Sequence, residues 1–314
     1  MGLLRNNLGE NKLQKKRSMK ELSIIIPHFG VPDKLFRLLD SIKENNKTEI
    51  IVIDDNSSTE VFKDIKSKYP NIILIKNTRG KGAGGARNCG LEIAKGKFIL
   101  FADSDDFFVE GYFSKIEKYL ESDYDLVFFF STSCIEGSSR LGERHLRYNG
   151  ILNEYNNHYQ KGVLFKFAVP WSKLIKKSLI LKYKIKFQEI IASNDVLFSL
   201  KTSFHAENIK VSKQIIYTVT TSNNSLTRKL TKPIVRSRFN AAIDYNKFLE
   251  SQEIHQYKMA MASHIYRAFK CGGSKFAYQI LRESFQKNQP IFQSISHFIS
   301  TLRHFKSGRY QHIK

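Results

Sequence analysis

The sequence is poor in the features that mark membrane-spanning and disulfide-stabilised proteins. Its 314 residues include only 3 cysteines and 6 prolines. It has no run of about 18 uncharged apolar residues, so we expect no helix that spans a bilayer. Cys89, Cys134 and Cys271 are far apart and match no zinc or redox pattern, which favours reduced thiols over a metal or disulfide framework.

The N-terminal segment also lacks the apolar stretch of a secretory signal. Residues 1–20 are polar and basic, and Met19 directly precedes the first strand-like run. We interpret residues 1–20 as a flexible basic tail and Met19 as a candidate natural start. These features predict a cytoplasmic protein.

Acidic residues are scarce relative to basic ones. The chain has 29 Asp and Glu against 51 Lys and Arg, a formal net charge of +22. Such an excess is typical of proteins that bind phosphorylated ligands, nucleic acids or anionic membrane surfaces. No nucleic-acid-binding signature accompanies the charge, so we expect no nucleic-acid partner. Hydrophobic residues make up 41% of the chain, enough for a folded core.

Strand and helix signals alternate between residues 21 and 131. Short apolar runs typical of strands buried on both faces occur at residues 22–27, 49–53, 71–75, 98–102 and 126–130. The segments between them have apolar residues at helical spacing. This alternation predicts an α/β fold with a mostly parallel central sheet and helices on both faces.

The most polar segments follow the predicted strands. They are residues 28–30, 54–57, the glycine-rich 79–85 and the acidic 103–106. Because parallel strands end at the same edge of a sheet, we expect these segments to share one cleft.

Asp103 and Asp105 at the end of a buried strand suit a divalent cation. Magnesium and manganese are often held by one or two carboxylates together with substrate phosphates. An acidic turn that caps the next helix is the alternative. The presence of Asp54 and Asp55 after the neighbouring strand favours the cation.

Gly80, Gly82 and Gly85 formally match the dinucleotide-binding pattern G-x-G-x-x-G. The pattern follows the third predicted strand instead of the first, which argues against a nicotinamide-dependent dehydrogenase. A basic, glycine-rich loop before a helix is the remaining interpretation, with backbone amides able to meet phosphate.

The second half of the chain is less regular. Residues 132–160 are polar and predict loop or weak structure, a short helix begins near residue 194, and residues 208–221 predict one or two strands. The pattern is helical beyond residue 232. We therefore divide the chain into a nucleotide-binding half (21–131), an acceptor half (132–225) and a basic helical region (226–314).

In this order, the segments resemble the bacterial family 2 glycosyltransferases, which have the GT-A fold. The resemblance runs from residue 21 to residue 225 and rests on SIIIPHFG, IIVIDDNSS, GAGGARNCGLEIAKGKFILFADSDD, VPWSKLIKKSLI and SNDVLFSLK. It implies inverting, Mn²⁺- or Mg²⁺-dependent transfer from a nucleotide-diphosphate sugar, with UDP expected. The implied acceptor is a saccharide or lipid-linked saccharide of surface polysaccharide synthesis.

The resemblance also implies roles for donor-side residues. The segment with Pro27 and Phe29 would contact the nucleotide base, with Phe29 in place of the usual tyrosine and Gly30 in place of an asparagine. Asp55 would bond to the base. Arg87, in the Ala-Arg-Asn element, would lie beside the diphosphate.

On the metal and acceptor sides, the resemblance implies that Asp105 binds the cation and that Asp103 flanks the sugar-phosphate. Asp195 matches the catalytic base, and Asn194 replaces the usual glutamate before it. Trp171 is a candidate to stack on an acceptor sugar, with a core position as the alternative.

Two questions stay open at the level of sequence. Departures at Phe29, Gly30 and Asn194 allow a non-catalytic sugar-nucleotide-binding or scaffold subunit. The intact Asp103, Asp105 and Asp195 argue against it. The basic region 226–314 suits either peripheral contact with the anionic inner face of the cytoplasmic membrane or a solvated appendage or dimer contact.

Overall fold

An 8-stranded mixed sheet forms the centre of the molecule, in the order β3-β2-β1-β4-β7-β6-β8-β5. The computed structural model describes residues 20–293, with the exceptions of residues 31, 44, 81, 139 and 223–228. The strands are β1 (Leu22–His28), β2 (Thr48–Asp54), β3 (Ile73–Lys76), β4 (Phe98–Phe101), β5 (Phe107–Phe108), β6 (Leu126–Ile135), β7 (Lys173–Lys176) and β8 (Ile209–Thr221).

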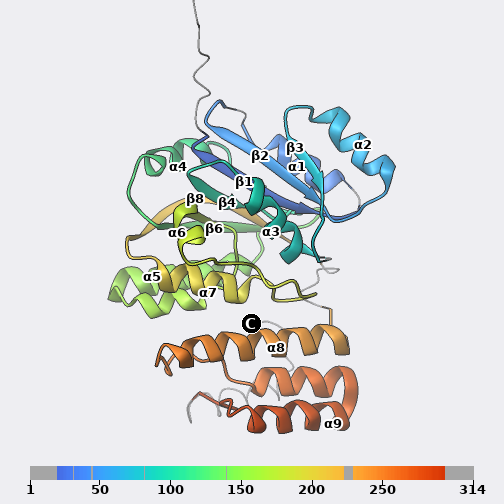
Figure 1. Ribbon diagram of the computed structural model, residues 1–314, viewed down its shortest axis with the longest axis vertical. Coiled ribbons are helices and arrows are strands. Elements are labelled where there is room, and N and C mark those ends of the chain that lie inside the picture. Colours follow the sequence, from blue (N-terminus) through green and yellow to red (C-terminus); the bar gives the residue numbers. More distant parts are fainter. Residues whose placement is uncertain are drawn as a thin grey trace, which may run out of the picture.

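Helices surround this sheet and continue beyond it (Figure 1). They are α1 (Asp33–Asp40), α2 (Thr59–Lys68), α3 (Ala83–Ile93), α4 (Tyr112–Leu120), α5 (Arg144–His158), the 3₁₀ segment η1 (Lys161–Lys166), α6 (Lys177–Lys182), α7 (Val196–His205), α8 (Lys232–Ser251) and α9 (Ala262–Gln286). The predicted α/β class with a helical C-terminal part is confirmed.

The first four strands form the parallel half of the sheet. β1 pairs in parallel with both β2 and β4, and β2 pairs in parallel with β3. All 7 residues of β1 are buried, which explains its uninterrupted apolar sequence. Since β1, β2 and β4 run in the same direction, the segments that follow them emerge at one edge, as predicted.

The other half of the sheet is mixed, because β6 and β8 pair in parallel whereas the remaining pairs are antiparallel. β7 pairs antiparallel with β4 and β6, and β5 pairs antiparallel with β8. The prediction of loop or weak structure over 132–160 was wrong, because β6 continues to Ile135 and α5 covers most of the remainder. Gly150 and several asparagines lower the helix propensity of α5, but Tyr148, Ile151 and Leu152 lie on one helical face and are buried.

The C-terminal helices lie at one end of the molecule, next to α7 (Figure 1). Val235 and Phe239 of α8 share a core cluster with Phe276 and Ile280 of α9. Tyr245 of α8 belongs to another cluster that includes residues of η1 and α7. Helices α8 and α9 are therefore packed onto the rest of the chain through apolar contacts. In the described part of the chain, no helix is long and apolar enough to cross a membrane.

Parts of the expected domain division lie outside the described residues. These parts are the tail up to Met19, the boundary region 223–228 and the C-terminal stretch 294–314.

Candidate active site

The ends of β1 and β2 bring the first expected site residues together. His28 pairs with Asp54 in parallel register, and the backbone N–H of Asp55 donates to the carbonyl of His28 at 2.7 Å. Pro27 is buried one position earlier in β1. The ring of Phe29, directly after the strand, is 63% exposed. An exposed aromatic ring therefore lies next to a buried pair of carboxylates at this edge.

The carboxylate of Asp55 is bonded to the glycine-rich segment. Its Oδ1 accepts from the side-chain amide of Asn77 at 2.7 Å, and its Oδ2 accepts from the backbone N–H of Gly82 at 2.8 Å. Gly82 has φ +108°, a conformation that favours glycine. Because a carboxylate has about four acceptor positions, Asp55 retains capacity for a ligand donor.

Arg87 connects the segment after β4 with the segment before α7. The residue is 5% exposed, and its guanidinium donates to Asp103 Oδ1 at 2.5 Å and to Asn194 Oδ1 at 2.8 Å. It also lies over the ring of Phe187, 5.3 Å from the centroid. Asn194 is uncharged, so only one of these two acceptors carries charge. The partners of Arg87 therefore neutralise its positive charge less than two carboxylates would, which favours binding of an anionic ligand.

Three aspartates after β4 lie close together. Asp106 is buried and accepts from the backbone N–H of Thr220 at 2.7 Å. Desolvation, with the charges on Asp105 and Asp103, raises the pKa of Asp106 well above its usual value. Asp105 reaches solvent, but partial desolvation and the charge on Asp103 raise the pKa of Asp105 as well. Desolvation and mutual repulsion therefore disfavour the charged forms of Asp105 and Asp106, and a nearby cation would favour them.

This cluster fits a divalent cation held jointly by protein and substrate. Among the described residues, no group of three or more His, Cys, Asp or Glu side chains could enclose a metal by itself. One or two carboxylates together with phosphate oxygens are, however, an ordinary ligand set for magnesium. Asp105, with Asp103 beside it, is the position at which such a set can form.

Arg144 is a site residue that the sequence did not reveal. It begins α5, and although burial lowers the pKa of Arg144, the charges of Tyr148, Asp106, Asp103 and Asp105 together raise it. A cation therefore faces the acidic cluster. Arg144 was missed because the segment around it was expected to be a loop.

Asp195 lies at the start of α7, half-buried. In the described chain its carboxylate makes no capping hydrogen bond to the helix. Burial lowers the pKa of Lys173 to about 7, and the charge of Asp195 opposes this shift. Lys173 Nζ is fully buried, donates to the carbonyl of Phe167 at 2.8 Å and lies over the ring of Phe128. The candidate base therefore stands in the field of a buried lysine.

Trp171 occupies the core position that the sequence left as an alternative. Its indole is fully buried, 4.8 Å from the ring of Tyr148 and stacked at 5.9 Å on Tyr217. The hydroxyl of Tyr217 accepts from the backbone N–H of Asp103 at 2.8 Å. Trp171 thus packs on the tyrosine that contacts Asp103. Its ring presents no surface to an acceptor in this structure.

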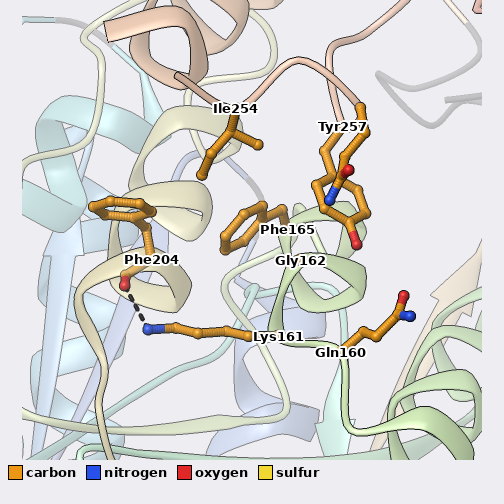
Figure 2. Close-up of a pocket in the computed structure, with 8 residues that line it drawn as sticks. Gln160, Lys161, Gly162, Phe165, Phe204, Ile254 and Tyr257 are labelled. Atoms are coloured by element: carbon orange, nitrogen blue, oxygen red, sulfur yellow. Dashed lines mark hydrogen bonds between the residues drawn. The ribbon is translucent and has the colours of Figure 1, made fainter. Parts of the chain in front are cut away.

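A pocket of about 690 Å³ lies away from these residues, at the far end of α7. Figure 2 shows Phe204 of α7, Phe165 of η1 and Tyr257 around it. Lys161 closes one side by donating to the carbonyl of Phe204 at 2.7 Å. Phe204 stands at the end of α7 opposite to Asp195, so the pocket and the candidate site are separate features.

Comparisons with known proteins agree with this arrangement. The model of the family Glycosyl transferase family 2 matches residues 23–183. The chain is 38% identical over 131 residues to the UDP-Glc:alpha-D-GlcNAc-diphosphoundecaprenol beta-1,3-glucosyltransferase WfaP of Escherichia coli, covering 36% of this chain and 52% of WfaP. It is 26% identical to the poly(ribitol-phosphate) beta-N-acetylglucosaminyltransferase TarP of Staphylococcus aureus, covering 86% of this chain and 82% of TarP. The match with WfaP thus spans about half of that protein.

Two solved structures have a similar fold. S. aureus TarS 1-349 in complex with UDP-GlcNAc superposes with a TM-score of 0.61 at 20% identity, covering 85% of this chain and 78% of TarS 1-349. The mannosyltransferase PcManGT of Pyrobaculum calidifontis, in complex with GDP-Man and Mn2+, gives 0.54 at 14% identity, covering 92% of this chain and 79% of PcManGT. Since the family model covers half of the sequence and the folds agree, the chain belongs to glycosyl transferase family 2.

Proposed function

We propose that the protein is an inverting glycosyltransferase that moves a sugar from a UDP-sugar to a hydroxyl of a saccharide acceptor. The acceptor is a surface polysaccharide or a lipid-linked oligosaccharide. Family membership supports sugar transfer, and the names of WfaP and of the TarS complex support a UDP-sugar donor. The observation that carries the proposal is the pair of hydrogen bonds from Arg87 to Asp103 and to Asn194, the neighbour of Asp195.

On the donor side, the exposed ring of Phe29 would stack on the base, and Pro27 would shape the strand end beneath it. Asp55 would accept a hydrogen bond from the base through a free lone pair. Arg87 would bind the diphosphate, which is the ligand group that its charge and forked geometry suit best.

Asp105, with Asp103, would hold Mn²⁺ or Mg²⁺. When bound, the cation would supply stabilisation of the negative charge that develops on the departing diphosphate. The raised pKa of Asp105 supports this assignment, because partly desolvated and mutually repelling carboxylates favour a nearby cation.

On the acceptor side, Asp195 would accept the proton of the attacking hydroxyl. One base and a single displacement at the anomeric carbon lead to inversion. A carboxylate is a weak base, so activation of the donor by Arg87 must supply much of the rate enhancement. Asn194 would then act by orienting Arg87.

A non-catalytic sugar-nucleotide-binding or scaffold subunit is the second candidate. The replacements at Phe29, Gly30 and Asn194 favour it. It predicts nucleotide binding without sugar transfer to any acceptor, whereas the transferase predicts both.

Peripheral contact with an anionic membrane surface is a further part of the proposal, and α9 supports it. Lys275, Tyr278, Arg282 and Phe285 follow helical spacing on one face, and Tyr278 and Phe285 are 64% and 65% exposed. Basic and aromatic side chains on one helical face are typical of helices that lie at a membrane interface. The lipid-linked acceptor in the name of WfaP is consistent with work at such a surface.

Vesicle sedimentation tests the membrane contact. We expect the full chain to bind vesicles that contain phosphatidylglycerol more strongly than neutral phosphatidylcholine vesicles, and Tyr278→Ser/Phe285→Ser to weaken this binding. Equal binding to both vesicle types, or no effect of the double variant, would contradict it.

Calorimetric titration with UDP and GDP, with and without Mn²⁺, tests the donor site. We expect metal-dependent binding of UDP by the wild type and its loss in Asp105→Ala. Absence of binding of either nucleotide under every metal condition would rule out the transferase. If UDP binds, transfer assays with UDP-sugars and saccharide acceptors separate the transferase from the scaffold subunit.

A further inference from the structure

Glu189 joins two segments that are far apart in the sequence. Its Oε2 accepts from the backbone N–H of Gly80 at 2.9 Å. Its Oε1 accepts from Arg79 at 3.3 Å and from the side-chain amide of Asn88 at 3.2 Å. One carboxylate is thus bonded to the glycine-rich segment and to α3.

The glycines of this segment fit closely against the chain around Glu189. A Cβ on Gly80 would lie 2.6 Å from Glu189 Oε2, and one on Gly84 would lie 2.1 Å from the carbonyl oxygen of Gln188. A Cβ on Gly85 would lie 1.9 Å from the carbonyl oxygen of Gly80. The close spacing of glycines, which suggested a dinucleotide fingerprint, is therefore explained by packing of the segment on itself and on residues 188–189.

The segment that contains Glu189 directly precedes Asp195, the candidate catalytic base. The backbone N–H of Gln188 donates to the carbonyl of Asn194 at 3.2 Å, which closes a loop just before Asp195. The same segment is anchored to α8, because the side chain of Gln188 donates to Asp244 at 2.8 Å and Ser237 donates to the carbonyl of Ala192 at 3.0 Å.

We propose that Glu189 is a positioning residue of the donor site: it fixes the glycine-rich segment against the segment before Asp195 and so keeps the Gly82 N–H on Asp55. This role rests on the proposed function, in which Asp55 contacts the nucleotide base of the donor. Gly80 and Gly82 are two positions apart, so release of Gly80 from Glu189 would free the backbone that holds Gly82.

The surroundings of Glu189 suit this role. Burial alone would raise the pKa of Glu189, but the Gly80 N–H, Asn88 and Arg79 together lower it, so the residue is ionised at neutral pH. Its side chain is 32% exposed. Its removal would therefore leave no large cavity in the core, and effects on the glycine-rich segment can be separated from global unfolding.

Hydrogen exchange of the ligand-free protein tests the contact itself. In Glu189→Ala, we expect amides of residues 79–84 to exchange about tenfold faster, as for the loss of one charge-assisted hydrogen bond, while β1 stays protected. Glu189→Gln keeps an oxygen that can accept from Gly80 and should recover most of the protection. Glu92→Ala removes the other ion-pair partner of Arg79 and is the matched control, with no expected change.

UDP titration tests the positioning role. We expect Glu189→Ala to weaken UDP binding about tenfold, with Glu189→Gln in between and Glu92→Ala unchanged. Unchanged exchange at residues 79–84 in both Glu189 variants would overturn the contact. Faster exchange with unchanged UDP affinity would overturn the positioning role. Failure of the wild type to bind UDP would instead remove the proposed function, while the exchange result would still decide whether Glu189 holds the segment.

Discussion

The donor and acceptor sides of the candidate site hold their carboxylates in different electrostatic surroundings. On the donor side, desolvation and neighbouring carboxylates raise the pKa values of both Asp105 and Asp106. On the acceptor side, Asp195 faces Lys173, and burial lowers the pKa of Lys173 to about 7. The donor side thus combines mutually repelling carboxylates with Arg87 and Arg144, whereas the acceptor side combines one carboxylate with a lysine whose burial favours its neutral form.

This difference separates two functions that aspartates serve in the proposed reaction. Carboxylates that repel one another are prepared to receive a cation with the substrate. Asp195 instead lies near a single buried lysine, and this carboxylate is the candidate proton acceptor. Arg87 lies between the two sides, bonded to Asp103 on one and to Asn194 on the other.

The largest expected effect comes from a change confined to the acceptor side. Asp195→Asn keeps the size of the side chain but removes the proton acceptor, so we expect sugar transfer to fall roughly 1,000-fold. UDP affinity should stay at the wild-type value, because the donor side is untouched. Calorimetry and a transfer assay on the same preparations check this. A parallel loss of UDP binding would show that the two sides are not separable in this way.

A change at Arg87 should instead disturb both sides. In Arg87→Lys, one ammonium cannot reproduce the forked contacts to Asp103 and Asn194, so we expect UDP affinity to fall roughly 30-fold and transfer to fall at least as much. Arg236→Lys, which alters an ion pair with Glu283 between α8 and α9, is the matched control. Equal effects of the two substitutions on UDP binding would contradict a specific role of Arg87.

The two sides also differ in how far the sequence predicted them. On the donor side, Asp55 and Asp103 directly follow apolar runs long enough to identify as buried strands, so parallel topology alone placed them together. On the acceptor side, β7 has only 4 residues and lies within a stretch whose apolar residues also suit a helix. Neither its antiparallel pairing nor the burial of Lys173 could be predicted from spacing.

Long-range side-chain contacts account for the rest of what the sequence could not predict. Glu189 and Gly80 are 109 positions apart, and no local pattern links them. Arg144 belongs to a helix with unfavourable residues that tertiary burial nevertheless stabilises. The roles inferred by resemblance for Asp55, Asp105 and Asp195 stay predictions until binding and transfer are measured.

Lys173 allows the electrostatics of the acceptor side to be measured without substrate. The pKa of Lys173 is about 7 in the folded protein against an ordinary value of 10.5, so between these values the unfolded chain binds more protons. Folding stability should therefore rise with pH in this window, by at most about 1.4 kcal/mol per pH unit from this group. Lys173→Met should lack this increase in denaturant-unfolding experiments. An identical pH dependence in wild type and variant would show that the lysine is not neutralised on burial.

The smallest expected effect concerns Phe29, where the donor side meets solvent. Its ring is 63% exposed, so Phe29→Ala should hardly change the free energy of unfolding. Loss of a stacked aromatic contact should weaken UDP binding by roughly fivefold. Phe29→Tyr restores the usual aromatic residue of the family and should keep or improve the affinity, which makes it the matched control. If the alanine variant binds UDP as tightly as the wild type, the base lies elsewhere, and contact through Asp55 must be reconsidered at the same time.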